Sequence, residues 1–137
     1  MITAQDAGRQ ATPMNPLLNA LLLAGAGAVG SLLRAGCTTL AGRLVGAAYP
    51  WGTLAVNLAG SFAFGAIVAL AKARALTTEQ EVVLLVGLIG GFTTYASFAF
   101  QATEMLASGR IVSAIVYMVT TNALGVAAVW AGLRTFR

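Results

Sequence analysis

The distribution of charged residues is the feature that most constrains this chain. No Asp, Glu, Lys or Arg occurs in residues 10–33, 44–71, 82–103 and 111–133. Each of these windows is at least 22 residues long, and about 20 helical residues cross a hydrocarbon core of ~30 Å. Only 9% of all residues are charged, whereas soluble domains average about 25%. The sequence therefore predicts an all-α membrane protein with four transmembrane helices, and it excludes a water-soluble domain.

The expected organisation of the chain follows from these windows. Residues 1–16 lack apolar periodicity and are expected to form a flexible N-terminal tail, and residues 17–134 a four-helix transmembrane domain. The four spans are expected at residues 17–33, 53–71, 82–103 and 111–133. The semi-polar stretch 34–50 can continue the first helix past the membrane. No basic segment leads into a short apolar run with a small-residue cleavage site, so we do not expect a secretory signal.

Residue types that usually carry catalysis are scarce. The sequence has no His, four acidic residues and one cysteine, Cys37. The absence of His excludes His-based catalysis and His-ligated zinc, and one cysteine forms neither an internal disulfide nor a cysteine-cluster metal site. Because no combination of acid, base and nucleophile exists, we do not expect an enzyme. Every span interior also lacks acidic residues, which argues against proton-coupled transport.

Basic residues are almost evenly divided between the two expected sides of the membrane. Four spans place both termini on one side, whose basic residues are Arg9, Lys72, Arg74, Arg134 and Arg137. The opposite side carries Arg34, Arg43 and Arg110. Because Arg9 lies in the tail, the difference is too small for the positive-inside rule to fix one orientation. Either the chain inserts in both orientations, which permits an antiparallel dimer, or another signal decides.

The third expected span contains the sequence Gly-Gly-Phe-Thr-Thr-Tyr-Ala-Ser-Phe at residues 90–98. Gly90 and Gly91 lie near its midpoint, and two glycines followed by two β-branched threonines are unfavourable inside a helix. A break there frees carbonyl and N–H groups, which inside a membrane must be buried in protein, line water or bind an ion. The alternative is an unbroken helix whose glycines pack against a neighbouring helix.

Aromatic residues recur every three positions in this segment, at Phe92, Tyr95 and Phe98. On a continuous helix they lie along one side. One interpretation is a packing stripe. The other uses the positive edges of the rings, because ring edges turned into a narrow pore hold a small anion without a fixed charge that traps it.

Polar residues in the other spans allow similar pairs of interpretations. Asn57 in the second span offers two N–H donors, for helix association or for an anion. In the fourth span, Ser113, Tyr117 and Thr121 repeat every four residues; their hydroxyls either replace part of an ion's hydration or bond back to their own helix. Arg34, near the expected end of the first span, either reaches the interface or raises the anion concentration at a pore mouth.

Three blocks together resemble the CrcB/Fluc family of bacterial fluoride channels: residues 27–34, 51–65 and 90–98. The resemblance covers residues 17–133. It implies an antiparallel, dual-topology homodimer in the bacterial inner membrane, with the third helix broken near the midplane. It further implies two narrow pores that passively and selectively export fluoride and so relieve its toxicity. The expected partners are fluoride, the lipid bilayer and a second copy of the chain, without nucleic acid.

The resemblance also implies roles for individual residues. The implied fluoride-pore residues are Asn57, Thr94, Tyr95, Phe98, Tyr117 and Thr121. Asn57 would donate to fluoride, and Tyr95 and Phe98 would take the paired pore phenylalanine positions, although Tyr95 adds a hydroxyl that the family usually lacks. A structural sodium ion at the dimer interface would be held by main-chain oxygens of Gly90 and Thr93. Arg34 would lie at the pore mouth.

Two other functions remain open at this point. A small four-helix proton-coupled multidrug exporter has a similar length and also permits dual topology. Such an exporter should carry a carboxylate within its first span, and this chain has none there. A third possibility is an assembly subunit whose glycine-rich helix faces bind another membrane protein.

Overall fold

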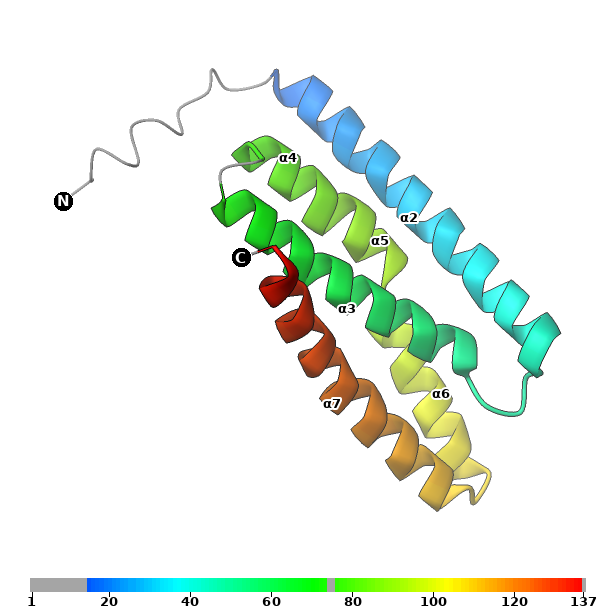
Figure 1. The fold of residues 1–137 in the computed structure, drawn as a ribbon. Coiled ribbons are helices and arrows are strands. Elements are labelled where there is room, and N and C mark those ends of the chain that lie inside the picture. Colours follow the sequence, from blue (N-terminus) through cyan, green and yellow to red (C-terminus); the bar gives the residue numbers. More distant parts are fainter. Residues whose placement is uncertain (1–14, 74–75, 137) are drawn as a thin grey trace.

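The computed structural model describes residues 15–73 and 76–136 (Figure 1). Within these residues, four helical spans are long and apolar enough to cross a membrane. They are Pro16–Val45, Trp51–Lys72, Thr78–Ala107 and Ile111–Thr135. The predicted all-α architecture with four spans is thus confirmed. The predicted tail, residues 1–16, lies outside the described residues except for Asn15 and Pro16, which begin the first helix.

Helix α2, Pro16–Val45, is longer than the predicted first span. The Asn15 side chain caps its start by accepting a hydrogen bond from the Leu17 N–H at 2.9 Å, and Gly46 ends it with a positive φ of 84°. Beyond position 33 the helix contacts the next helix at Thr38 and Ala41. A Cβ at Gly52 would lie 2.7 Å from the Thr38 Cα. The close approach of α2 to the following helix therefore requires glycine at position 52.

Helices α3, Trp51–Lys72, and α7, Ile111–Thr135, approach each other closely. A Cβ at Gly132 would overlap the Phe62 carbonyl oxygen and lie 2.8 Å from the Ala66 N. A Cβ at Gly65 would likewise lie only 3.0 Å from the Leu133 N of α7. Each backbone therefore lies directly against the other at these glycines, as small residues allow in membrane helices.

The third span consists of four consecutive helical segments. They are α4 Thr78–Val82, the π-helix η1 Val83–Ile89, α5 Gly90–Phe92 and α6 Tyr95–Ala107. A capping box between Thr77 and Gln80 starts α4. Between α5 and α6 the chain is extended at Thr93 (φ −82°, ψ 159°) and Thr94 (φ −149°, ψ 114°). The predicted break therefore exists, at the β-branched threonines rather than at the glycines before them, which are helical.

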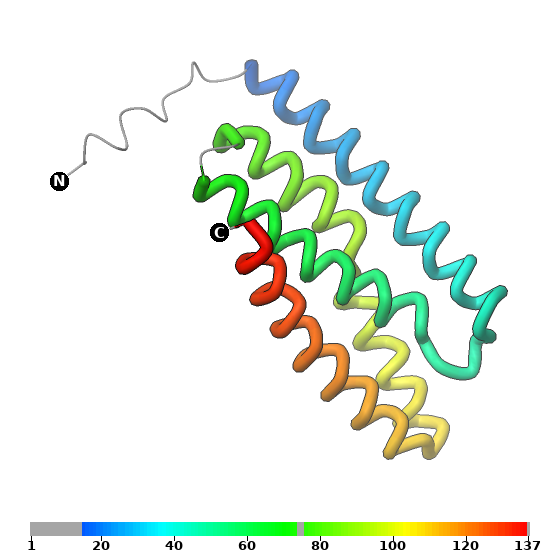
Figure 2. The backbone as a smooth tube through the Cα atoms, viewed as in Figure 1, coloured from blue at the N-terminus to red at the C-terminus, as the bar shows by residue number. Residues whose placement is uncertain are grey.

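The two ends of the bundle have different components. The start of α2, the end of α3, the start of α4 and the end of α7 lie at one end (Figures 1 and 2). The opposite end contains the loop of residues 46–50 and the turn of residues 108–110. The first helix therefore starts, and the last helix ends, at the same end of the bundle. Of the basic residues in the predicted charge count, Arg9, Arg74 and Arg137 lie outside the described residues.

Candidate functional site

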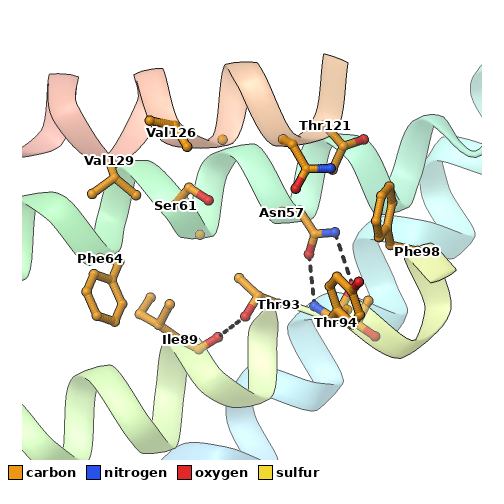
Figure 3. A pocket seen from close by; sticks show the side chains of 14 residues that line it. Asn57, Ser61, Phe64, Ile89, Thr93, Thr94, Phe98, Thr121, Val126 and Val129 are labelled. Carbon is orange, nitrogen blue, oxygen red and sulfur yellow. Dashed lines mark hydrogen bonds between the residues drawn. The ribbon is translucent and has the colours of Figure 1, made fainter. Parts of the chain in front are cut away.

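The Asn57 side chain joins α3 to the break in the third span. Its Oδ1 accepts a hydrogen bond from the Thr94 N–H at 2.9 Å, and its Nδ2 donates to the Thr94 carbonyl at 3.1 Å (Figure 3). The carboxamide therefore pairs with both backbone groups of one extended residue. One N–H of the amide is left for another acceptor.

The two threonines at the break each satisfy part of the interrupted helix. The Thr93 hydroxyl donates to the Ile89 carbonyl at 2.9 Å, which also accepts the Thr93 N–H. The Thr94 hydroxyl caps α6 by accepting the Ser97 N–H at 3.2 Å. A Cβ at Gly60 would overlap the Thr93 methyl group, so a glycine in α3 makes room for the break.

The carboxyl end of α5 presents carbonyl groups without their usual helical partners. In a continuous helix the Thr94 N–H would donate to the Gly90 carbonyl, but here it donates to Asn57. The next carbonyl, of Gly91, accepts a hydrogen bond from the Arg34 Nε at 3.1 Å. Arg34 therefore lies at the level of the break, with its positive charge at a helix carboxyl end, and α2 continues for three turns beyond it.

An open groove of about 470 Å³ runs beside the break. Five of the six predicted pore residues line it: Asn57, Thr94, Tyr95, Phe98 and Thr121. In the view of Figure 3, Asn57 lies between Thr121 and Thr94. Thr121 is only 9% exposed, and its hydroxyl has no hydrogen-bond partner among the described residues. The groove thus combines a free amide N–H and an unpaired hydroxyl, and no charged residue is among those that line it.

The predicted aromatic stripe is interrupted, because Phe92 precedes the break and only Tyr95 and Phe98 share α6. Their environments also differ. Phe98 is 6% exposed and Tyr95 is 77% exposed, with ring centroids 5.6 Å apart. Within one chain, therefore, Phe98 packs in the core while Tyr95 projects from the protein.

Polar side chains of the fourth span have different hydrogen-bond partners. Thr120 and Asn122 bond back to their own helix, to the carbonyls of Val116 and Met118, each at 2.7 Å. Tyr117 is fully buried and turns away from the groove. Its hydroxyl donates to the Gln101 Oε1 at 2.9 Å.

Gln101 and Thr53 are polar residues that the sequence analysis missed. The Gln101 Nε2 donates to the Thr53 hydroxyl at 3.0 Å, so Tyr117, Gln101 and Thr53 form a hydrogen-bonded chain. A second cavity of about 280 Å³ is lined by Arg34, Thr94 and both missed residues. The available sequence signal was the position of Gln101, one helical turn after Phe98 in a window without charged residues.

Comparison with known proteins identifies the family. The family described as "CrcB-like protein, Camphor Resistance (CrcB)" matches residues 21–133. The chain belongs to the CrcB family. All three sequence blocks of the predicted resemblance fall within the matched region.

Relatives of this CrcB-family chain come from several bacteria. A protein of Rhizobium leguminosarum bv. trifolii is 43% identical over 124 residues, covering 88% of this chain and 98% of the relative. A protein of Nitrosococcus oceani is 42% identical over 113 residues, with 82% and 89% coverage. One of Thermus thermophilus is 40% identical over 114 residues, with 83% and 91% coverage. Each is named "Fluoride-specific ion channel FluC".

Family membership decides two of the predictions for this CrcB-family chain. The family is one of ion channels, so the prediction that the chain is not an enzyme is confirmed. The multidrug-exporter alternative is not favoured, since the matched relatives carry the channel name. Among the described residues, no group of three or more His, Cys, Asp or Glu side chains could hold a metal ion.

Proposed function

We propose that this chain is a fluoride-selective channel of the bacterial inner membrane that lets fluoride leave the cell passively. Its membership of the CrcB family and the channel names of its relatives support this function. The observation in the structure that carries the proposal is the unpaired hydroxyl of the buried Thr121, which lines the same groove as Asn57. A buried polar group without a partner needs a ligand or water.

The groove offers fluoride neutral donors in place of water. Asn57 has one free N–H, Thr121 has its hydroxyl, and the first turn of α6 has backbone N–H groups beside the break. Fluoride gives up strong hydration on leaving water, and such donors replace part of it. Because no fixed charge lines the groove, bound fluoride is held weakly enough to move on.

A second copy of the chain completes the path in this proposal. The groove is open along one side, and Tyr95 at its rim is 77% exposed. Polar groups of the groove cannot face lipid without cost, so a protein surface is needed to cover them. An antiparallel homodimer with two pores fits the nearly even division of basic residues. Such a dimer also places Tyr95, at the rim of the groove, where two subunits meet.

A structural sodium ion is part of the proposal. Carbonyl oxygens at the ends of broken membrane helices are suited to sodium, and the Gly90 carbonyl has lost its helical partner to Asn57. Together with the Thr93 carbonyl it supplies two neutral oxygens. A second copy would double that number, so the ion belongs at the contact between subunits. Sodium would hold the two breaks together there.

Fluoride efflux from liposomes containing the purified protein tests the function. Vesicles loaded with potassium fluoride should release fluoride only after valinomycin carries the balancing potassium, because a passive channel moves net charge. Vesicles loaded with potassium chloride should show no chloride release. Fluoride release no greater than from protein-free vesicles would refute the proposal. Release of a cationic drug driven by a proton gradient would instead support the exporter.

A further inference from the structure

A third cavity lies at the end of the bundle where α2 ends and α3 begins. Its volume is about 260 Å³, and its walls come from α2, the loop of residues 46–50, α3, α6 and the start of α7. Two of its lining residues are charged: Glu104 and Arg110. Arg110 precedes α7 and is exposed. The cavity therefore differs from the groove beside the break, whose lining is uncharged.

Shared side chains connect this end cavity to the groove. Gln101 and Thr53 line both the end cavity and the 280 Å³ cavity. Thr94 lines the 280 Å³ cavity and also the groove that contains Asn57. Neighbouring spaces thus share lining residues all the way from the break to the end of the bundle. Hydroxyl and amide groups occur along the whole series.

Arg110 holds the rim of the end cavity in place. Its Nη1 donates to the Ala48 carbonyl at 3.0 Å, and its Nε donates to the Ser108 hydroxyl at 3.1 Å. The first bond crosses from the α6–α7 turn to the α2–α3 loop. In that loop, Tyr49 packs edge-on against Tyr117 with ring centroids 5.5 Å apart. The guanidinium therefore positions a loop that contacts the hydrogen-bonded chain inside the bundle.

The charge of Arg110 is available to an anion. All its hydrogen bonds in the structure go to neutral oxygens, and it forms no ion pair within the described residues. Glu104 is the opposing charge on the same cavity and repels anions. A basic residue at the mouth of a path raises the local anion concentration, an effect that salt screens. The balance of these two charges sets the potential at the mouth.

We infer that the end cavity is where the fluoride path meets water, and that Arg110 both positions its rim and attracts the anion. This inference rests on the proposed function and adds a site of entry and two residues that control it. The groove beside the break then lies deeper along the same route. A unit charge about 8 Å from the entering ion changes its concentration about two- to fivefold at low ionic strength.

Charge variants test the inference through the liposome efflux assay at subsaturating fluoride. At low ionic strength, Arg110→Gln should lower the initial rate about two- to fivefold, and Glu104→Gln should raise it by a similar factor. Both differences should vanish at about 1 M salt, where the Debye length is ~3 Å. Arg43→Gln is the matched control, since Arg43 lies in the last turn of α2 and does not line the cavity. Its rate should change much less than that of either cavity variant.

A second measurement remains informative if Arg110→Gln fails to fold. In a Cys37→Ser background, Gly42→Cys places a thiol on the cavity wall, and Gly36→Cys places one elsewhere on α2. A Cβ at either glycine meets nothing within 4 Å, so both variants should fold. A sulfonate-bearing thiol reagent should slow efflux through Gly42→Cys more than an ammonium-bearing one of similar size. Neither reagent should affect Gly36→Cys.

The outcomes separate this inference from the proposed function. If the unmodified chain conducts fluoride but both charge variants match Arg43→Gln, the end cavity is not the entrance. Equal effects of the two thiol reagents on Gly42→Cys would also overturn the inference. If the unmodified chain conducts no fluoride, the proposed function fails and the inference fails with it.

Discussion

Replacing Asn57 by Asp adds a negative charge at the groove with almost no change in side-chain size. One carboxylate oxygen can keep the hydrogen bond that the Thr94 N–H donates to the Asn57 Oδ1 at 2.9 Å. The other oxygen faces the Thr94 carbonyl, to which the amide Nδ2 donated at 3.1 Å. A partly buried carbonyl left without its donor costs about 1–3 kcal/mol. We therefore expect Asn57→Asp to fold with somewhat reduced stability.

The effect on fluoride flux should be much larger than the effect on folding. A carboxylate about 4 Å from a passing anion, at an effective dielectric constant of ~20, repels it by about 4 kcal/mol. Since each 1.4 kcal/mol is a factor of about ten, the occupancy of the site falls roughly 10³-fold. Efflux from liposomes should then drop below about 1% of the unmodified rate.

Two further variants separate charge from structure in this experiment. Asn57→Ala loses both hydrogen bonds to Thr94 without adding charge, so it should retain more flux than Asn57→Asp. Asn15→Asp makes the same chemical change at the start of α2, where Asp caps a helix as well as Asn does, and its flux should be unchanged. If folded Asn57→Asp carries more than about a tenth of the unmodified flux, Asn57 does not contact the permeating anion.

Three other expected outcomes follow from the structure. Gly132→Ala, whose Cβ would overlap α3, should lower the free energy of unfolding by about 1–3 kcal/mol, while Gly36→Ala, in open space, should not; denaturation in detergent measures both. Thr121→Val should lower fluoride efflux yet leave the thermal midpoint unchanged or higher, because it removes an unpaired buried hydroxyl; a lower midpoint with normal efflux would contradict this. Sodium at 100 times its Kd should stabilise the purified protein by about 2.7 kcal/mol relative to N-methylglucamine at equal ionic strength. Equal thermal midpoints in the two cations would refute the sodium site.

The positions of the spans were predictable because membrane insertion acts on local composition. Uncharged windows of sufficient length identify membrane helices whatever their partners. The break was predictable for a similar reason, since adjacent β-branched residues weaken any helix locally. The position of the break at Thr93 and Thr94 was less predictable from the sequence. It depends on Asn57, which is 37 residues away in sequence and replaces the helical hydrogen bond of Thr94.

The candidate site was only partly predictable, since its contacts join distant segments. The sequence placed Arg34 near a helix end, but the structure pairs it with the Gly91 carbonyl, because α2 continues to Val45. The spacing of Tyr95 and Phe98 does not indicate that one is exposed and the other buried. Gln101 has no distinctive neighbours in sequence, and its importance depends on Thr53 and Tyr117, which lie in other helices.

The contact between Arg34 and Gly91 also has a consequence for the order of synthesis. The two residues are 57 positions apart, so at about 5–20 residues per second Arg34 emerges roughly 3–11 s before its partner. An arginine at the centre of a membrane helix costs about 2.5–3.5 kcal/mol. The first helix should therefore initially insert with Arg34 still at the aqueous interface. Arrival of the third span should then draw that arginine inward, so we expect the nascent chain to reach its final depth in two stages.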